Sequence, residues 1–173
     1  MFKKQNYTKA YETDITPIIS TIIPVYNCNK TIYSAINSIL NQNYTDFEII
    51  LIDDCSKDNS LKIIQDIQEK DKRIKVLKNK KNMGTLYSRS LGVLISKGEY
   101  IFPLDNDDFF FSDDIFSSIL KIAQEYKFDI VGFRAISIND YNNIDIEKMK
   151  DLYDYSTNIK YLDDYLKWPI YTS

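Results

Sequence analysis

An apolar strand runs directly into three carboxylates in the stretch Gly98-Glu99-Tyr100-Ile101-Phe102-Pro103-Leu104-Asp105-Asn106-Asp107-Asp108. Carboxylates this close repel one another and raise each other's pKa unless a cation neutralises them. Oxygen ligands of this kind suit Mg²⁺ or Mn²⁺. A solvated acidic turn is the alternative. However, open α/β sheets bind ligands beyond the carboxyl ends of their strands, which favours a site for a divalent metal here.

Strands and amphipathic helices alternate along the chain on both sides of this stretch. Runs of β-branched and aromatic residues predict strands at 18–25, 47–52, 74–77, 100–104 and 130–138. Apolar residues at helical spacing predict helices at 32–40, from Ser60 onward, at 86–95 and at 115–126, the last capped by Ser112 or Asp113, with short helices at 147–153 and 163–167. Repeated strand–helix units predict an α/β fold with a mostly parallel sheet and helices on both faces.

Length and composition narrow the class of protein. The 173 residues suffice for one domain, which we expect to comprise an N-terminal extension at 1–16, a ligand-binding core at 17–138 and a C-terminal extension at 139–173. The net charge is −3 and the basic residues are scattered, so the sequence does not indicate a basic patch that would bind nucleic acid. The sequence has no histidine, so carboxylates are the main candidates for acid–base chemistry near neutral pH.

The sequence also bears on the location of the protein. The N-terminus lacks the apolar stretch of a signal peptide, and no apolar run reaches the length of a membrane span. Cys28 and Cys55 have no metal-ligand spacing. We therefore expect a reduced, cytoplasmic protein whose attachment to a membrane, if any, is peripheral.

Two groups of polar residues follow the first two expected strands, where such a sheet binds its ligand. Pro24, Tyr26 and Asn27 offer an aromatic face and an amide to a base or sugar, although a plain strand-to-helix turn explains them equally well. The second strand delivers Asp53 and Asp54. We expect one of these two carboxylates to face the ligand and the other to face the loop backbone.

A glycine turn, Asn82-Met83-Gly84, enters the third expected helix, and Arg89 lies one turn further along. A guanidinium there could meet a phosphate. An ordinary surface arginine is the simpler explanation of this residue taken alone.

Taken in order, these motifs closely resemble the nucleotide-sugar-binding half of family 2 glycosyltransferases, which have the GT-A fold. The resemblance covers residues 18–133. It implies that a sugar passes, with inversion, from a nucleotide-sugar donor, most commonly a UDP-sugar, to a hydroxyl acceptor. The motifs that carry it are Ile22-Ile23-Pro24-Val25-Tyr26-Asn27, the strand from Glu48 to Asp54 with Ser56 and Asp58, Asn82-Met83-Gly84 with Arg89, and Gly98-Glu99-Tyr100-Ile101 with Asp105-Asn106-Asp107-Asp108.

The resemblance also implies roles for individual residues. Asp105 and Asp107 would hold Mn²⁺ or Mg²⁺ against the donor diphosphate, with Asp107 as the direct ligand and Asp105 nearer the ribose or the waters of the metal. Asp54 would accept a hydrogen bond from the base, and Arg89 would approach the nucleotide. The nucleoside would be lined by Pro24, Tyr26, Asn27 and Asn106. Cys55 stands where the family often has glycine, so that loop is expected to be less free to adopt positive φ.

Members of the family deprotonate the acceptor with an Asp or Glu well beyond the metal motif. Asp163 and Asp164 are candidates, but residues 161–166 are more simply explained as an exposed amphipathic helix, and no catalytic base is identified. We therefore expect a donor-binding portion that transfers slowly by itself. A longer native chain, an oligomer or a partner chain would complete it.

Two other functions stay open at this point. A non-catalytic module would bind a nucleotide sugar without turnover. A phosphotransferase of the aspartyl-phosphate type has weaker support, because Phe109 stands where its loop needs Thr or Val and the motif follows the fourth expected strand rather than the first.

Overall fold

The computed structural model describes residues 1–3 and 17–132. These residues belong to the first of two units into which the chain divides, Met1–Phe133. The strands and helices expected between residues 18 and 126 are all present, with ends shifted by at most one residue. The elements are β1 (Phe2–Lys3), β2 (Ile19–Val25), α1 (Ile32–Leu40), β3 (Phe47–Asp53), α2 (Ser60–Gln68), β4 (Ile74–Lys78), α3 (Thr85–Ile95), β5 (Tyr100–Pro103) and α4 (Ile115–Glu125).

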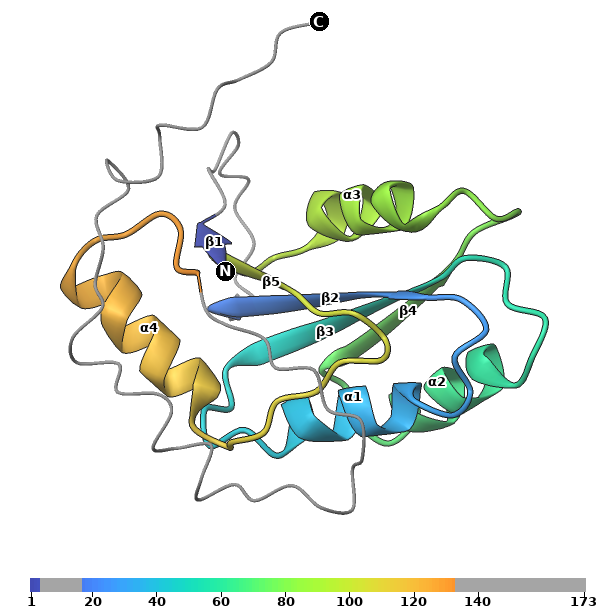
Figure 1. The fold of residues 1–173 in the computed structure, drawn as a ribbon, viewed down its shortest axis with the longest axis horizontal. Coiled ribbons are helices and arrows are strands. Elements are labelled where there is room, and N and C mark those ends of the chain that lie inside the picture. Colours follow the sequence, from blue (N-terminus) through green and yellow to red (C-terminus); the bar gives the residue numbers. More distant parts are fainter. Residues whose placement is uncertain (4–16, 133–173) are drawn as a thin grey trace, which may run out of the picture. The chain divides into compact units, whose positions relative to one another are not determined.

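The strands form one sheet in the order β1-β5-β2-β3-β4 (Figure 1). The four strands β2 to β5 are parallel, as expected, while β1 pairs antiparallel with β5. The register sets Ile22 opposite Pro103 and Val25 opposite Asp53. The strands that precede the three predicted polar groups therefore end at the same edge of the sheet.

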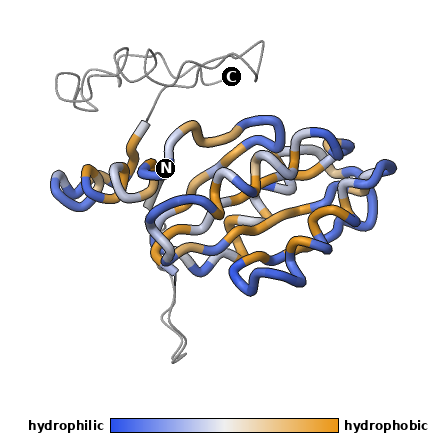
Figure 2. The backbone as a smooth tube through the Cα atoms, turned by 90° about the horizontal axis from the view of Figure 1, so that it is seen from below, coloured by the Kyte–Doolittle hydropathy of each residue, from blue (hydrophilic) through white to orange (hydrophobic). Residues whose placement is uncertain are grey.

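The two faces of the sheet are covered unequally. One face packs against α1, α2 and α4 in a large core that contains Ile23, Ile36, Ile64 and Phe116. The other face carries a smaller cluster around Ile22, Ile50, Ile52 and Ile101, which α3 covers with half-buried side chains. Figure 1 shows α3 alone on its side of the sheet within the described part of the chain. Figure 2 shows hydrophobic stretches in the interior of this part and hydrophilic stretches at many of its outer turns.

Three details differ from the sequence predictions or extend them. The strand β1 was not predicted, because two residues are too few to show a period. Helix α4 has Asp114 at its N-cap rather than Ser112 or Asp113. At the expected closing strand, Val131 N donates to Met1 O at 2.9 Å, but residues 133–138 lie outside the described part of the chain. Other predictions also fall outside the described part of the chain. These are the short helices expected at 147–153 and 163–167 and the domain boundaries at 16 and 138.

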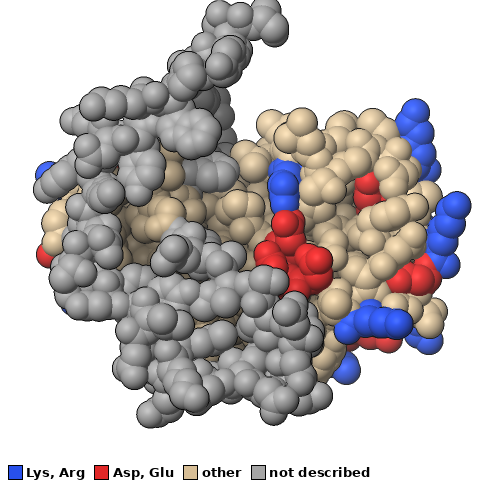
Figure 3. All heavy atoms as spheres, in the orientation of Figure 1, with Lys and Arg blue, Asp and Glu red and all other residues tan. Residues whose placement is uncertain are grey.

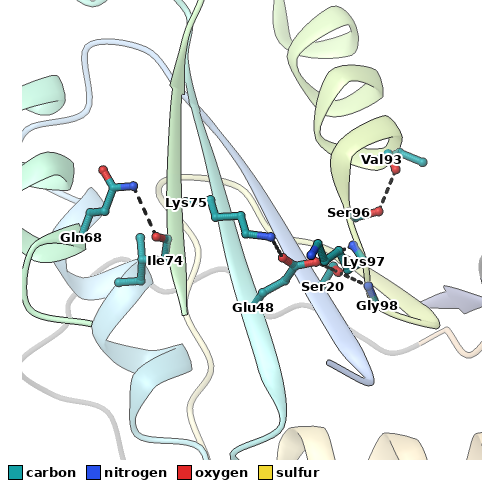
Figure 4. A network of polar contacts seen from close by, with 9 residues as sticks. All are labelled: Ser20, Glu48, Gln68, Ile74, Lys75, Val93, Ser96, Lys97 and Gly98. Carbon is teal, nitrogen blue, oxygen red and sulfur yellow. Dashed lines mark hydrogen bonds and ion pairs between the residues drawn. The ribbon is translucent and has the colours of Figure 1, made fainter. Parts of the chain in front are cut away.

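A buried carboxylate ties the amino ends of the strands together (Figure 4). Glu48 on β3 accepts hydrogen bonds from Ser20 Oγ, Lys75 Nζ and Lys97 N, each at 2.6 Å. Ser20 Oγ in turn accepts a hydrogen bond from Gly98 N at 2.8 Å. Burial by itself would raise the pKa of Glu48, but these donors together hold it below its usual value. The network thus connects β2, β3 and β4 to the segment that leads into β5.

Gly98 packs directly on the backbone of β2. A Cβ at this position would lie 2.5 Å from Ser20 Oγ, 2.6 Å from Ser20 N and 2.8 Å from the carbonyl carbon of Ile19. We expect Gly98→Ala to lower the free energy of unfolding by about 1–3 kcal/mol, because backbone atoms must move to accommodate the methyl group. Urea unfolding measures this. Gly132→Ala is the matched control, since its Cβ would meet no atom of the described residues within 4 Å, and equal losses in the two variants would contradict this explanation.

Candidate active site

The acidic turn after β5 is joined to the end of β2. Leu104 N donates to Ile22 O at 3.1 Å, which continues the pairing of the two strands by one residue. Asn106 Nδ2 donates to Pro24 O at 2.9 Å. The turn that carries Asp105 and Asp107 is therefore held beside the polar residues that follow β2.

Arg89 reaches this turn from α3. Its guanidinium forms an ion pair with the Asp105 carboxylate, and the two side chains are respectively 38% and 49% exposed. Among the described residues, the buried Arg89 Nε has no hydrogen-bond partner. The site thus combines carboxylates with a partly exposed guanidinium, a group that can bind an anionic ligand. On the face drawn in Figure 3, acidic side chains gather in a compact patch against a basic side chain.

A cavity of about 340 Å³ opens beside this ion pair. Its polar groups are those of Arg89, Asp105 and Asp108, and its apolar wall comes from both the sheet and α3. Gly92 allows the helix to approach the sheet closely, because a Cβ there would lie 2.4 Å from Ile22 Cγ2. The cavity is lined by Ile22, Arg89, Val93, Ile101, Pro103, Asp105 and Asp108.

The carboxylates of the turn affect one another. Burial first, and then the negative charges of Asp107 and Asp105, raise the pKa of Asp108. Asp107 itself is exposed. Within residues 1–3 and 17–132, no three His, Cys, Asp or Glu side chains are arranged to hold a metal ion. A divalent cation at this turn would therefore need oxygens from a ligand in addition to the protein's carboxylates.

The loops that follow β2 and β3 are hydrogen-bonded to each other. Asn27 N donates to Ser56 Oγ at 3.1 Å, and Lys57 N donates to Asn27 Oδ1 at 2.8 Å. Asn27 has φ 49° and Cys55 has φ 65°, so both adopt the left-handed conformation. The expectation that Cys55 would restrict this loop was wrong in that respect. Tyr26 is 42% exposed, which leaves its ring accessible to a ligand.

Both members of the acidic pair after β3 accept hydrogen bonds from the backbone. Asp53 Oδ1 accepts from Ser56 N at 3.2 Å. The buried Asp54 carboxylate accepts from Met83 N and Gly84 N, each at 2.8 Å, and from Asn79 Nδ2 at 2.7 Å. Burial by itself would raise the pKa of Asp54, but these three donors lower it. Both carboxylates thus contact the loop backbone, and the expected contact of Asp54 with a base stays a prediction.

Asn79 is a site residue that the sequence analysis missed. It is buried, and its Nδ2 also donates to Ser88 Oγ on α3 at 3.1 Å. It thereby joins the end of β4, Asp54 and the helix that carries Arg89. An asparagine after a strand is common in ordinary turns, so this position gave no distinguishing signal.

Gly84 begins α3 in a conformation that other residues avoid. It has φ 87° and ψ 161°, and a Cβ there would meet nothing within 4 Å. We expect Gly84→Ala to cost about 1–3 kcal/mol of stability through backbone strain alone. Thermal unfolding measures this. Lys81→Ala in the same loop is exposed and should leave stability nearly unchanged, and a Gly84→Ala variant as stable as Lys81→Ala would contradict the argument.

The parallel α/β sheet of this topology, with an acidic turn beyond its fourth parallel strand, matches the GT-A fold of solved glycosyltransferase structures. The family model for glycosyl transferase family 2 matches residues 20–172, and the chain belongs to this family. This membership decides against the aspartyl-phosphate phosphotransferase. The candidate bases Asp163 and Asp164 lie outside the described residues.

Known relatives and solved structures agree with this membership. An uncharacterized glycosyltransferase of Haemophilus influenzae is 37% identical over 131 residues, which is 76% of this chain and 50% of the relative. The Escherichia coli enzyme UDP-Glc:alpha-D-GlcNAc-diphosphoundecaprenol beta-1,3-glucosyltransferase WfaP is 41% identical over 111 residues, or 64% of this chain and 43% of the relative. The chain thus spans about half of these relatives or less.

The structure of Staphylococcus aureus TarS 1-349 with UDP-GlcNAc is similar to this chain over 69% of this chain and 37% of that chain, with a TM-score of 0.62 and 26% identity. The mannosyltransferase PcManGT from Pyrobaculum calidifontis, in complex with GDP-Man and Mn²⁺, shares the fold, with a TM-score of 0.58 and 18% identity. No helix in the described part of the chain is both long and apolar enough to cross a membrane.

Proposed function

We propose that this chain binds a UDP-sugar through a divalent metal ion and supplies the donor site of an inverting glycosyltransferase. The observation that carries the proposal is the ion pair between Arg89 and Asp105, which lies beside a cavity at the carboxyl edge of the sheet. A partly exposed guanidinium recognises phosphate oxygens, and exposed carboxylates recognise the cation that accompanies a diphosphate.

The donor set of the acidic turn fits Mn²⁺ or Mg²⁺. Asp107 and Asp105 would hold the ion, because both lie in the turn that follows β5 and Asp107 is exposed. When bound, such an ion neutralises charge on the departing nucleotide. The need for ligand oxygens at this turn predicts that metal and diphosphate bind together.

The other residues act on the nucleotide itself. Arg89 would donate to the diphosphate through the exposed part of its guanidinium. Tyr26 would stack its accessible ring on the base. Pro24, Asn27 and Asn106 would shape the nucleoside site by fixing the positions of the two turns, since Asn106 bonds Pro24 O and Asn27 bonds the loop after β3. Asp54 supports the nucleoside site and would accept a hydrogen bond from the base.

The choice of uracil as the base is supported by two similar proteins. The WfaP name specifies UDP-Glc, and the TarS structure contains UDP-GlcNAc, whereas the more distant mannosyltransferase contains GDP-Man. We expect UDP to bind at least about tenfold more tightly than GDP or TDP in the presence of Mn²⁺, a difference of about 1.4 kcal/mol. Calorimetric titration of the three nucleotides measures this. Equal affinities would contradict a UDP-specific site.

A further inference from the structure

Large apolar side chains are exposed together on α3, outside the candidate active site. Leu86 is 80% exposed and Leu94 is 77% exposed, and the neighbouring Tyr87 and Met83 are 46% and 41% exposed. Single exposed hydrophobic residues are ordinary. Here, however, four of the eight large hydrophobic residues that are exposed in the described part of the chain fall between positions 83 and 94.

Helical geometry places these side chains on the outward side of α3. The buried residues Ser88 and Gly92 are four apart and mark the side that contacts the sheet. Leu86, Ser90 and Leu94 are also spaced by four, and they lie on the opposite side, with Tyr87 next to them. We call Met83, Leu86, Tyr87 and Leu94 the apolar stripe. Nothing in the described residues covers it.

A basic cavity adjoins this stripe. It measures about 520 Å³ and shares Met83 and Tyr87 with the stripe. The three lysines that line it are all exposed and have no ion-pair partner among the described residues. Asp54 holds this loop in place through Met83 N and Asn79 Nδ2. The cavity is lined by Lys78, Asn79, Lys80, Lys81, Met83 and Tyr87.

We propose that the apolar stripe and Lys78, Lys80 and Lys81 form a surface that binds anionic phospholipid membranes peripherally. Lysines beside exposed aliphatic and aromatic side chains suit an interfacial helix, whose apolar residues enter the acyl boundary while the ammonium groups meet lipid phosphates. A second copy of the chain is a less suitable partner for this surface than a membrane. A specific protein interface needs about 800 Å² from each partner, whereas α3 has 11 residues, roughly 16 Å of helix, and is flanked by uncompensated positive charge.

The lysines of this surface and the candidate active site lie at the same, carboxyl edge of the sheet. The loop that carries the lysines follows the carboxyl end of β4, and the acidic turn follows the carboxyl end of β5 in the same parallel sheet. Binding there would bring the carboxyl edge of the sheet to the membrane. The proposal does not depend on the identity of the donor, so it can fail while the proposed function holds.

Co-sedimentation with lipid vesicles tests the proposal. We expect the chain to bind vesicles that contain phosphatidylglycerol, to bind vesicles of phosphatidylcholine alone weakly, and to dissociate as salt is raised. The double variant Lys80→Glu, Lys81→Glu should lose at least about tenfold in vesicle affinity. Leu86→Ser, Leu94→Ser should also weaken binding. The exposed side chains of both pairs make these substitutions compatible with folding, which cooperative thermal unfolding verifies.

The control variant Lys62→Glu, Lys70→Glu makes the same charge change in α2 and in the turn that follows it, on the opposite face of the sheet. It should retain most of the vesicle binding. Equal affinity for both lipid compositions, or an equal loss in this control, would overturn the proposal. The proposal would also be overturned if the chain did not bind vesicles and instead sedimented as a dimer that the variant Leu86→Ser, Leu94→Ser dissociates. The apolar stripe would then be an interface between copies of the chain.

Discussion

Replacing Glu48 by alanine should lower the free energy of unfolding by about 3 kcal/mol or more. The substitution removes the acceptor for Ser20 Oγ and Lys97 N and leaves the ammonium of Lys75 without its carboxylate. The loss should appear as a lower urea midpoint with an unchanged slope. Glu69→Ala is the control, since Glu69 is exposed and should change stability by no more than about 0.5 kcal/mol. Similar midpoints in the two variants would contradict the proposed importance of the network.

The same carboxylate should make stability depend on pH. The pKa of Glu48 in the folded chain lies below its usual value of 4.5. Its contribution to stability is therefore complete above that value and is lost as the pH falls through the lower folded pKa. We expect the Glu48→Gln variant to lose less stability than the original chain over this acidic range. A parallel loss in both proteins would indicate that Glu48 is not the group that titrates.

The sequence predicted the order of strands and helices because burial leaves a clear pattern. Every residue of β2 and β3 is buried, so both strands are near-continuous apolar runs. In the helices, apolar residues recur at helical spacing, so that they fall on the side of the helix that faces the sheet. By contrast, β1 has two residues, and its position depends on pairing with β5 nearly a hundred residues away, which no local pattern records.

The site was predicted as a set of residues but not as a set of contacts. Parallel strands bring their carboxyl ends to one edge, so the approach of the acidic turn to the end of β2 follows from topology, whereas the ion pair between Arg89 and Asp105 was not predicted. The hydrogen-bond partners of Asp54 could not be predicted from topology, because the hydrogen bonds from Met83 N and Gly84 N depend on how a loop of several residues folds back. The left-handed φ of Cys55 has the same origin, since surrounding hydrogen bonds impose a conformation that its own preferences oppose.

Replacing Asp107 by alanine should abolish the stimulation of UDP binding by Mn²⁺. Asp107 is exposed in the acidic turn and has no hydrogen-bond partner among the described residues, so the variant should fold normally. Its UDP affinity in the presence of Mn²⁺ should fall to the value without metal, a loss of at least about tenfold, or 1.4 kcal/mol. Asp66→Ala on α2 removes one exposed carboxylate elsewhere and should keep the stimulation. Undiminished stimulation in Asp107→Ala would assign the metal to other residues.

The most direct test of the donor site is the affinity of the unmodified chain for UDP, measured by titration calorimetry with and without Mn²⁺. Two carboxylates offer too few oxygens to hold the ion tightly, and the diphosphate supplies the rest, so each ligand should strengthen the binding of the other. The account predicts UDP binding at least about tenfold tighter with Mn²⁺ than without it. The same UDP affinity in both conditions would contradict it.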